Sequence, residues 1–107
     1  MSTYQLDQLD DFGPFPGLTA KLVHAEGQTL AFWTIEKDAV LPEHSHVHQQ
    51  IVVVTEGELE MTVSGEKQVL KPGSVLVIPP HAPHSAVALT PVKVTDIFHP
   101  GREDFPQ

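Results

Sequence analysis

Residues 42–50 read PEHSHVHQQ, and the apolar run IVVV follows directly at residues 51–54. Three of the chain's seven histidines lie in this segment. On an extended strand, residues two apart share a face, so the even positions from His44 to Gln50 can project to one side, about 7 Å apart. Imidazole is a good ligand for first-row transition ions. The segment therefore indicates a metal site, although a histidine on a strand can equally be a polar residue satisfied by its neighbours.

The pattern of the rest of the chain predicts short strands. Ten prolines and seven glycines interrupt it so often that no window of helical length keeps a 3.6-residue apolar period. About eight runs rich in Val, Ile, Thr and aromatic residues lie between the breaks, which is typical of an all-β sandwich or barrel. Leu59, Met61 and Val63 alternate with polar residues, which predicts a strand with one buried face. The run VLVI at residues 75–78 predicts a strand covered on both faces.

The segment 92–98 predicts a strand whose inward face carries two functional candidates. Its valines alternate with polar residues, and Asp96 and Phe98 share the side of the valines. A carboxyl group that points into an apolar interior is a candidate acid or base, whereas at a barrel mouth it would be a polar residue satisfied by backbone groups. Asp96 is therefore a candidate for proton transfer. Trp33 and Met61 are expected in the core, where they can also form the apolar wall of a cavity.

Length and charge limit the architecture and the partners. With 107 residues, one domain is expected, in which residues 1–17 form an N-terminal arm and residues 18–107 form the barrel. A short all-β chain buries a modest fraction of its surface and leaves strand edges exposed, so a homodimer is predicted. Fourteen acidic and six basic side chains give a net charge of −8, which disfavours nucleic acid and anionic membranes as partners.

The cysteine content limits the possible metal ligands, and the amino terminus bears on the cellular location. The chain has no cysteine, so a transition metal has to be bound through imidazole, carboxylate or amide groups. Residues 1–17 carry acidic side chains where a signal peptide has positive charge, and no stretch reaches the length of a membrane span. These features predict a cytoplasmic protein whose partner is a small-molecule substrate.

Two motifs resemble those of the cupin superfamily. Residues 44–57 carry the pattern H-x-H-x3-Q-x6-G, which resembles the first cupin motif, where two His and one Glu precede a turn glycine. Residues 73–84 carry G-x5-P-x-H-x2-H, which resembles the second motif, where one further His is a ligand. The resemblance implies a single-domain cupin β-barrel of the jelly-roll type. It also implies one divalent metal ion per chain, of Ni, Zn, Mn or Fe. The implied ligands are His44, His46, Gln50 and His84.

The chain departs from the cupin pattern at four positions. Asp38 and His81 stand where the motifs have Gly, Ala88 stands where the second motif ends in Asn, and Gln50 stands where the first has Glu. A neutral amide leaves more positive charge on an ion than a carboxylate does. His81 could bind the ion only if its loop were rearranged. His48, which the motif does not use, is expected to make a polar contact beside the ligands.

A ligand set of three His and one Gln resembles the site of the KdgF-like cupins of pectin and alginate breakdown. Residues 96–105 (DIFHPGREDF) resemble the C-terminal segment of that group, in which an Asp, a Phe and an Arg line the sugar pocket. The resemblance implies catalytic roles for Asp96 and Arg102 and a substrate-binding role for Phe98. Arg102 has a bidentate fork that suits a sugar carboxylate, or it forms an exposed ion pair in the tail.

These features lead to three functional hypotheses. The first is conversion of a 4,5-unsaturated uronate sugar from its cyclic form to linear 5-keto-4-deoxyuronate, with the metal ion as Lewis acid. The second is a metal-dependent cupin dioxygenase, in which open coordination positions carry the function. The third is a non-catalytic cupin that binds a sugar or another small ligand. The fold alone does not decide between them.

Overall fold

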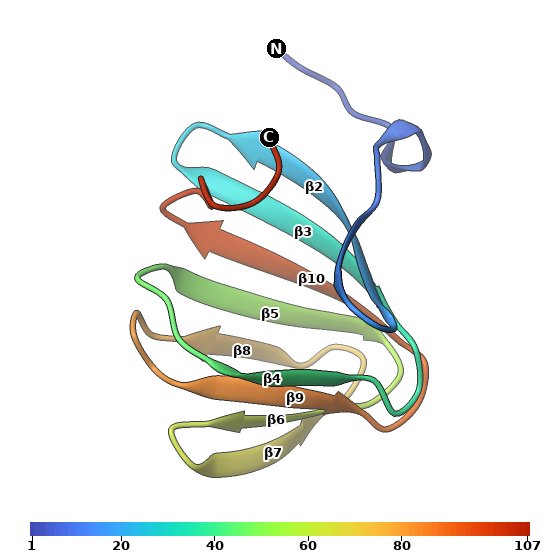
Figure 1. Cartoon of the computed structure of the whole chain (residues 1–107), viewed down its shortest axis with the longest axis vertical. Helices are drawn as coiled ribbons and strands as arrows, with labels where there is room; N and C mark the ends of the chain where they lie inside the picture. The colour runs from blue at the N-terminus through green and yellow to red at the C-terminus, as the bar shows by residue number, and fades with distance from the viewer.

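The chain folds into ten antiparallel strands and one short 3-10 turn (Figure 1). The computed structural model describes residues 1–107. The elements are η1 (Leu6–Gln8), β1 (Phe12–Phe15), β2 (Leu18–Ala25), β3 (Gln28–Ile35), β4 (Val40–His44), β5 (Gln49–Glu56), β6 (Leu59–Val63), β7 (Glu66–Leu70), β8 (Val75–Ile78), β9 (His84–Ala88) and β10 (Val92–His99). Six strands form one sheet, in the order β1-β2-β3-β10-β5-β8, and four form a second, in the order β4-β9-β6-β7.

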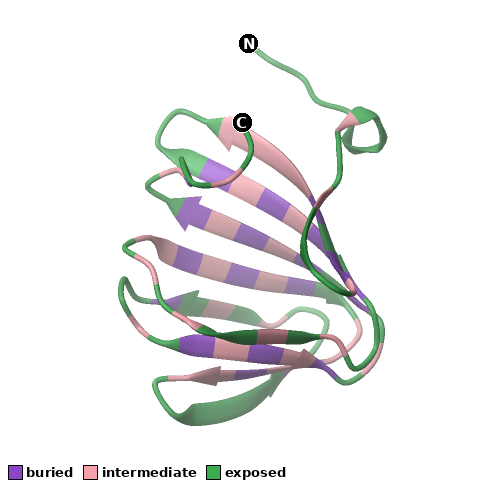
Figure 2. Ribbon diagram, in the orientation of Figure 1, coloured by how far each residue is buried: buried purple, intermediate pink, exposed green.

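An apolar core lies between the two sheets. Figure 2 shows buried and partly exposed residues alternating along β3, β5 and β10, as expected for strands with one face against a core. Buried apolar residues from both sheets form a single cluster. The fold is an all-β jelly-roll sandwich, so the predicted fold class is confirmed. The strand count exceeds the sequence prediction because short strands such as β1 contain Gly and Pro, which a pattern-based reading takes as breaks.

The prediction that residues 75–78 are covered on both faces was wrong. These residues form β8, which lies at the edge of the six-stranded sheet. Ile78 points inward and is fully buried, whereas Val75 and Val77 are 62% and 55% exposed on the outer face. An apolar run shows which environment its side chains prefer, but it does not show whether another layer lies over them.

Eight residues adopt left-handed backbone conformations that favour glycine, among them three at glycine positions of the cupin motifs. Gly57 joins β5 to β6 with a φ of 81°, and a Cβ atom there would lie 2.0 Å from the Pro91 carbonyl oxygen. Asp38 and His81, which replace the two cupin glycines, adopt φ values of 70° and 67°. Each non-glycine residue in this region costs about 1 kcal/mol or more. The backbone N–H of His81 donates to the His46 carbonyl oxygen at 2.8 Å, which holds the two motif loops together.

The amino-terminal segment contributes to both the sheet and the interior. β1 pairs with β2 at the edge of the six-stranded sheet. Phe12 and Phe15, at the two ends of β1, line the interior cavity described below. No helix of this structure has the length and apolar character needed to cross a membrane.

Candidate metal centre and adjoining cavity

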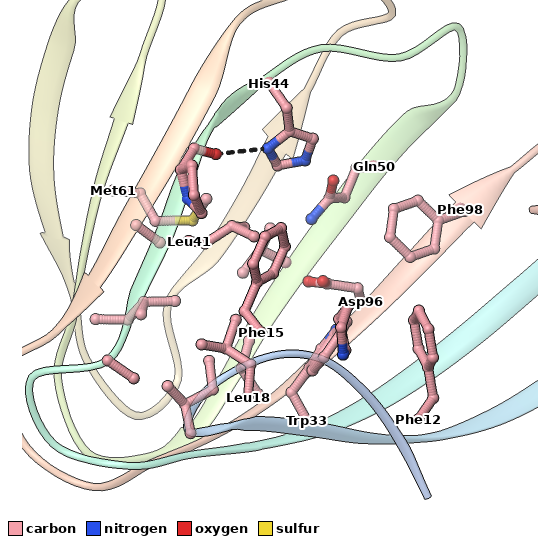
Figure 3. A pocket seen from close by; sticks show the side chains of 18 of the residues that line it. Phe12, Phe15, Leu18, Trp33, Leu41, His44, Gln50, Met61, Asp96 and Phe98 are labelled. Carbon is pink, nitrogen blue, oxygen red and sulfur yellow. Dashed lines mark hydrogen bonds between the residues drawn. The ribbon is translucent and has the colours of Figure 1, made fainter. Parts of the chain in front are cut away.

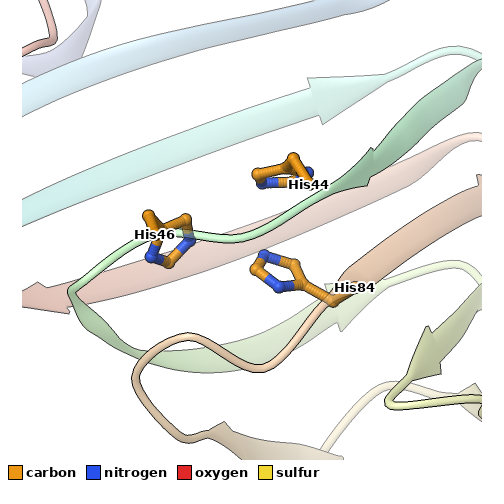
Figure 4. Close-up of side chains that lie close together, drawn as sticks. All are labelled: His44, His46 and His84. Carbon is orange, nitrogen blue, oxygen red and sulfur yellow. The ribbon is translucent and has the colours of Figure 1, made fainter.

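Three histidines from separate parts of the chain converge beside the four-stranded sheet (Figure 4). His44 is the last residue of β4 and is paired with His84, the first residue of β9. His46 lies in the loop between β4 and β5. One nitrogen of each ring lies within 4.8 Å of the other two. The three histidines are therefore positioned to bind a metal ion together.

Backbone carbonyl groups orient the three rings. The Nδ1–H group of each ring donates to the carbonyl oxygen two residues away along the chain, at 2.9 Å for His44, 3.1 Å for His46 and 2.9 Å for His84. A carbonyl oxygen can only accept a hydrogen bond, so Nδ1 carries the proton in each ring. The Nε2 atoms keep their lone pairs, which is the tautomer and orientation of metal-binding imidazoles.

Burial favours the neutral form of the His46 and His84 rings, which is the form that a metal ligand requires. Desolvation, followed by the positive charge of Arg102, lowers the pKa of His46 to about 4. Desolvation also lowers the pKa of His84. Nε2 of His84 is buried without a hydrogen-bond partner. A buried nitrogen in this state is costly unless another group takes its lone pair, and a metal ion is such a group.

Gln50 presents its amide oxygen to the histidines. It lies in β5, is 4% exposed, and its Oε1 atom is 3.1 Å from Nε2 of His46. Both atoms carry lone pairs, so they repel each other unless a cation lies between them. Their separation is also close to that of neighbouring ligands that are each about 2.1 Å from one ion. Three imidazoles and an amide oxygen therefore fit a divalent first-row ion.

The route by which the ligands converge differs from the sequence prediction. Residues 45–48 are not part of a strand. The chain leaves the four-stranded sheet at His44 and enters the six-stranded sheet at Gln49. Even spacing along one extended strand is therefore not what brings the ligands together, and that explanation was wrong. The bend between the two sheets turns His46 and Gln50 toward each other.

Two further histidines lie outside the cluster. The His48 ring is 5.4 Å from the His46 ring and 6.4 Å from the Phe98 ring, measured between centroids. Its Nδ1 atom is buried without a hydrogen-bond partner, so the polar contact expected for His48 stays a prediction. His81 is exposed and is not among the clustered histidines.

An apolar cavity of about 340 Å³ adjoins the cluster (Figure 3). Two thirds of its 21 lining residues are hydrophobic, and a few polar side chains project into it, as in many small-molecule sites. The cavity brings together all the residues that the sequence singled out for catalysis or substrate binding. They are Trp33, Met61, Asp96, Phe98 and Arg102.

Asp96 is the buried carboxyl group of the cavity. It lies on β10 between β3 and β5 and is 8% exposed, so the inward orientation predicted from strand alternation is confirmed. Burial raises the pKa of Asp96 to about 7, against the opposing effect of hydrogen bonds with Gln50 and Trp33. The Gln50 amide nitrogen lies on the Asp96 side in Figure 3. A carboxyl group with a pKa near neutrality can both accept and donate a proton.

Arg102 is not an exposed tail residue, which was one of its two sequence interpretations. It is 8% exposed, and its guanidinium carbon lies 4.7 Å from the Phe98 ring centroid and 4.0 Å from that of Phe105. Its Nε and Nη2 groups donate to the two carboxylate oxygens of Asp104 at 2.9 Å and 2.8 Å. These hydrogen bonds lower the pKa of Asp104 to about 2.

Sequence reasoning missed the contributions of the two chain ends. Phe12 from the amino-terminal segment lies 5.0 Å from Phe105 of the tail and 6.1 Å from Trp33, measured between ring centroids. Asp104 was not singled out either. The only available signal was the presence of phenylalanines in otherwise polar terminal segments, because neither segment has a strand pattern long enough to predict an inward face.

Comparisons with known proteins agree with this architecture. A family model described as Cupin domain matches residues 31–98. The chain is 37% identical over 71 residues to the pectin degradation protein KdgF of Dickeya dadantii (strain 3937), and this match covers 64% of the chain and 64% of that protein's length. The structure of KdgF from Halomonas sp. superposes with a TM-score of 0.90 at 34% identity, covering 97% of each chain. An RmlC-like cupin from Shewanella frigidimarina NCIMB 400 gives a TM-score of 0.87 at 32% identity, covering 94% of this chain and 91% of that one. The motifs, the jelly-roll fold and these similarities together show that the chain belongs to the cupin family and is a KdgF-like cupin.

Proposed function

We propose that the protein is a metal-dependent enzyme that converts a 4,5-unsaturated uronate monosaccharide from its cyclic form to linear 5-keto-4-deoxyuronate. One observation carries the proposal: a single apolar cavity adjoins the histidine cluster and is lined by a carboxyl group with a pKa near neutrality and by a buried guanidinium group. The similarity to proteins named KdgF, one of them a pectin degradation protein, supports the same substrate class.

Phe98 contacts both ends of the proposed site. Its ring lies 5.7 Å from the His46 ring and 4.7 Å from the Arg102 guanidinium carbon. The histidine cluster and the guanidinium group are therefore no farther apart than these two distances combined. One sugar ring can bridge that span, with its carboxylate at Arg102 and its ring oxygen toward the histidines.

The reaction is an isomerisation, so every atom remains in the substrate. The anomeric hydroxyl loses its proton, the bond from C1 to the ring oxygen breaks, and C1 becomes an aldehyde. The former ring oxygen is then the oxygen of an enolate on C5, and addition of one proton to C4 produces the 5-ketone. Asp96 moves the proton to C4, because both of its protonation states are populated near neutral pH.

The remaining cavity residues bind and orient the sugar. Arg102 binds the sugar carboxylate through paired N–H groups. Phe98, Trp33 and Met61 provide an apolar wall that restricts the ring and excludes water.

The ion is Ni, Zn, Mn or Fe, and it supplies Lewis-acid stabilisation of negative charge on oxygen when it is bound. All four ligands are neutral, so they leave the charge of the ion undiminished. They are His44, His46, Gln50 and His84.

The test follows the ultraviolet absorbance of the conjugated double bond. Purified protein is loaded with Ni, Mn, Zn or Fe in turn and mixed with fresh 4,5-unsaturated galacturonate, with His84→Ala protein and substrate alone as controls. Metal-dependent acceleration that is absent in the variant is the expected result. No acceleration by correctly metallated protein would overturn the proposal.

After that negative result, two further measurements distinguish a dioxygenase from a non-catalytic binding protein. Oxygen consumption with a diphenol or a diketone, dependent on Fe or Mn, would identify a dioxygenase. Sugar binding that persists after metal removal, without turnover in any assay, would identify a non-catalytic binding protein.

We also propose that a second copy of the chain covers the outer face of the six-stranded sheet. Strand register places one apolar row straight across five adjacent strands. The row consists of Val23, Leu30, Ile97, Ile51 and Val77. The row beside it consists of Lys21, Phe32, Thr95, Val53 and Val75. Neither row contains an acidic residue, although the chain has a net charge of −8, and the one charged residue, Lys21, is paired with Asp11 of the same chain. Two copies can therefore meet here without opposing carboxylates.

Sedimentation tests this interface. Val77→Lys places a charge within the proposed buried surface, at the β8 end of the apolar row, and is expected to convert a dimer to a monomer, since an unpaired buried charge is costly. Val69→Lys is the matched control, because Val69 is an exposed valine on β7 in the other sheet. A monomeric wild-type protein, or a dimer that survives Val77→Lys, would contradict the proposed interface.

A further inference from the structure

Two aromatic rings lie against the Arg102 guanidinium group. Its central carbon is 4.7 Å from the Phe98 ring centroid and 4.0 Å from that of Phe105, and these two rings are 5.6 Å apart at an interplanar angle of 85°. The backbone N–H of Arg102 donates to Oγ1 of Thr29 at 2.8 Å, and Thr29 is fully buried. Aromatic contacts hold a guanidinium group in place, but they leave it free to turn relative to its hydrogen-bonding partners.

A carboxylate removes this remaining freedom. Arg102 has five N–H donors, and Asp104 accepts from two of them, on Nε and Nη2. The other three N–H groups, two on Nη1 and one on Nη2, have no acceptor within the protein. One N–H of Nη1 and the free N–H of Nη2 form the end edge of the guanidinium group, which is the geometry that binds a second carboxylate in a bidentate manner.

The two edges of Arg102 face different spaces. Arg102 lines both the interior cavity and an outer depression of about 600 Å³. Asp104 lines the outer depression and does not line the cavity. A ligand inside the cavity therefore meets the edge that Asp104 leaves free.

We propose that Asp104 is a positioning residue that holds Arg102 with its free edge toward the cavity, where that edge binds the carboxylate of a uronate. The substrate class rests on the proposed function. The opposite possibility is that Asp104 occupies the carboxylate site and competes with the substrate. The two roles predict opposite effects of Asp104→Asn on uronate affinity.

Nuclear magnetic resonance tests the positioning without any ligand or turnover. Arg102 is the only arginine in the chain, so a single ¹⁵N-labelled Nε–H signal reports on it. The wild-type protein is expected to show a slowly exchanging Nε–H, and Asp104→Asn a rapidly exchanging one. Glu103→Gln removes the same charge from the neighbouring residue, which forms no ion pair, and is expected to match the wild type. Equal exchange in the two variants would overturn the proposal.

Ligand titration tests the consequence for recognition. Galacturonate is a saturated uronate that cannot undergo the reaction, and galactose lacks the carboxylate. Asp104→Asn is expected to weaken galacturonate binding about tenfold, because hydrogen bonds to charged groups are the strong ones, while leaving galactose binding unchanged. With the unsaturated substrate, the metal-loaded variant is expected to show a higher KM and a kcat close to that of the wild type.

The outcomes separate this inference from the proposed function. Galacturonate binding that depends on Asp104, without turnover of the unsaturated substrate, would reject the enzyme proposal and keep the positioning role. Tighter galacturonate binding by Asp104→Asn would show that Asp104 is a competitor and would overturn the inference. Absence of galacturonate binding by the wild-type protein would overturn it as well, because no uronate site would then exist.

Discussion

The histidine cluster and the Arg102 end of the cavity are held in place by contacts of different range. Each histidine of the cluster is oriented by a carbonyl oxygen two residues away along the chain. The Arg102 guanidinium group also has near neighbours along the chain, namely Asp104, Phe105 and Phe98, but the Arg102 backbone N–H donates to Thr29, which is 73 residues away. Local contacts therefore orient the side chains at both ends, whereas the backbone at the Arg102 end is anchored to the sheet by a long-range hydrogen bond. The two ends of the site should respond separately to mutation.

Removal of a ligand at the histidine end should have the largest effect. His84→Ala removes a fully buried Nε2 atom from the cluster and is expected to weaken divalent-metal binding by more than about a hundredfold. Calorimetric titration of the metal-free protein with Ni or Zn measures the change. His81→Ala is the matched control, since this exposed histidine of the same motif lies outside the cluster, and it should bind metal like the wild type. Equal losses of metal affinity in the two variants would show that His84 is no more a metal ligand than His81 is.

Asp96 lies between the two ends, and its effect should depend on pH. Burial raises its pKa from 3.8 to about 7, so in the metal-free protein its contribution to stability is complete below pH 3.8 and is lost as the pH rises through about 7. Asp96→Asn cannot ionise. At about 1.4 kcal/mol per pKa unit, the variant should gain roughly 4 kcal/mol relative to the wild type across this range.

Urea denaturation of both metal-free proteins at a series of pH values measures this gain. His46 and His84 have lowered pKa values, so they contribute stability of the opposite pH dependence, which is lost as the pH falls. Both proteins contain these histidines, so the difference between them isolates Asp96. A difference that does not change with pH would show that Asp96 is not desolvated in the folded protein.

Thr29→Val should have the smallest effect and should act on the Arg102 end alone. It preserves side-chain volume but leaves the Arg102 backbone N–H without an acceptor, and it removes the hydroxyl group that contacts Nδ1 of His24. We expect a loss of about 1 kcal/mol in stability and a few-fold weaker galacturonate binding, with unchanged metal affinity. Thermal unfolding and paired titrations measure these values. Thr34→Val, on the exposed face of the same strand, is the control and should leave stability, galacturonate binding and metal affinity unchanged. A loss of metal affinity in Thr29→Val would show that the two ends of the site are coupled.

Strand alternation and motif spacing predicted much of the site. Alternation placed Asp96 and Phe98 on the inward face of their strand, and both are buried. The alternation of Leu59 and Met61 also predicted their burial correctly. These predictions succeeded because a strand has a two-residue period, which a few consecutive residues are enough to reveal.

The sequence by itself determined the all-β class and the inward faces of the central strands, because these features depend on short-range periodicity. The three clustered histidines followed from the resemblance of two motifs to those of the cupin superfamily. Only the tertiary structure decided that Val75 and Val77 are exposed, that His46 and Gln50 meet across a bend in the chain and that Arg102 is buried beside the cavity. The first depends on the position of β8 at a sheet edge, and the second on the bend between two sheets. The third depends on the tail folding back, so that the Arg102 backbone N–H donates to Thr29, 73 residues away. Such contacts join residues whose proximity is set by the packing of the whole chain, and no local sequence pattern encodes it.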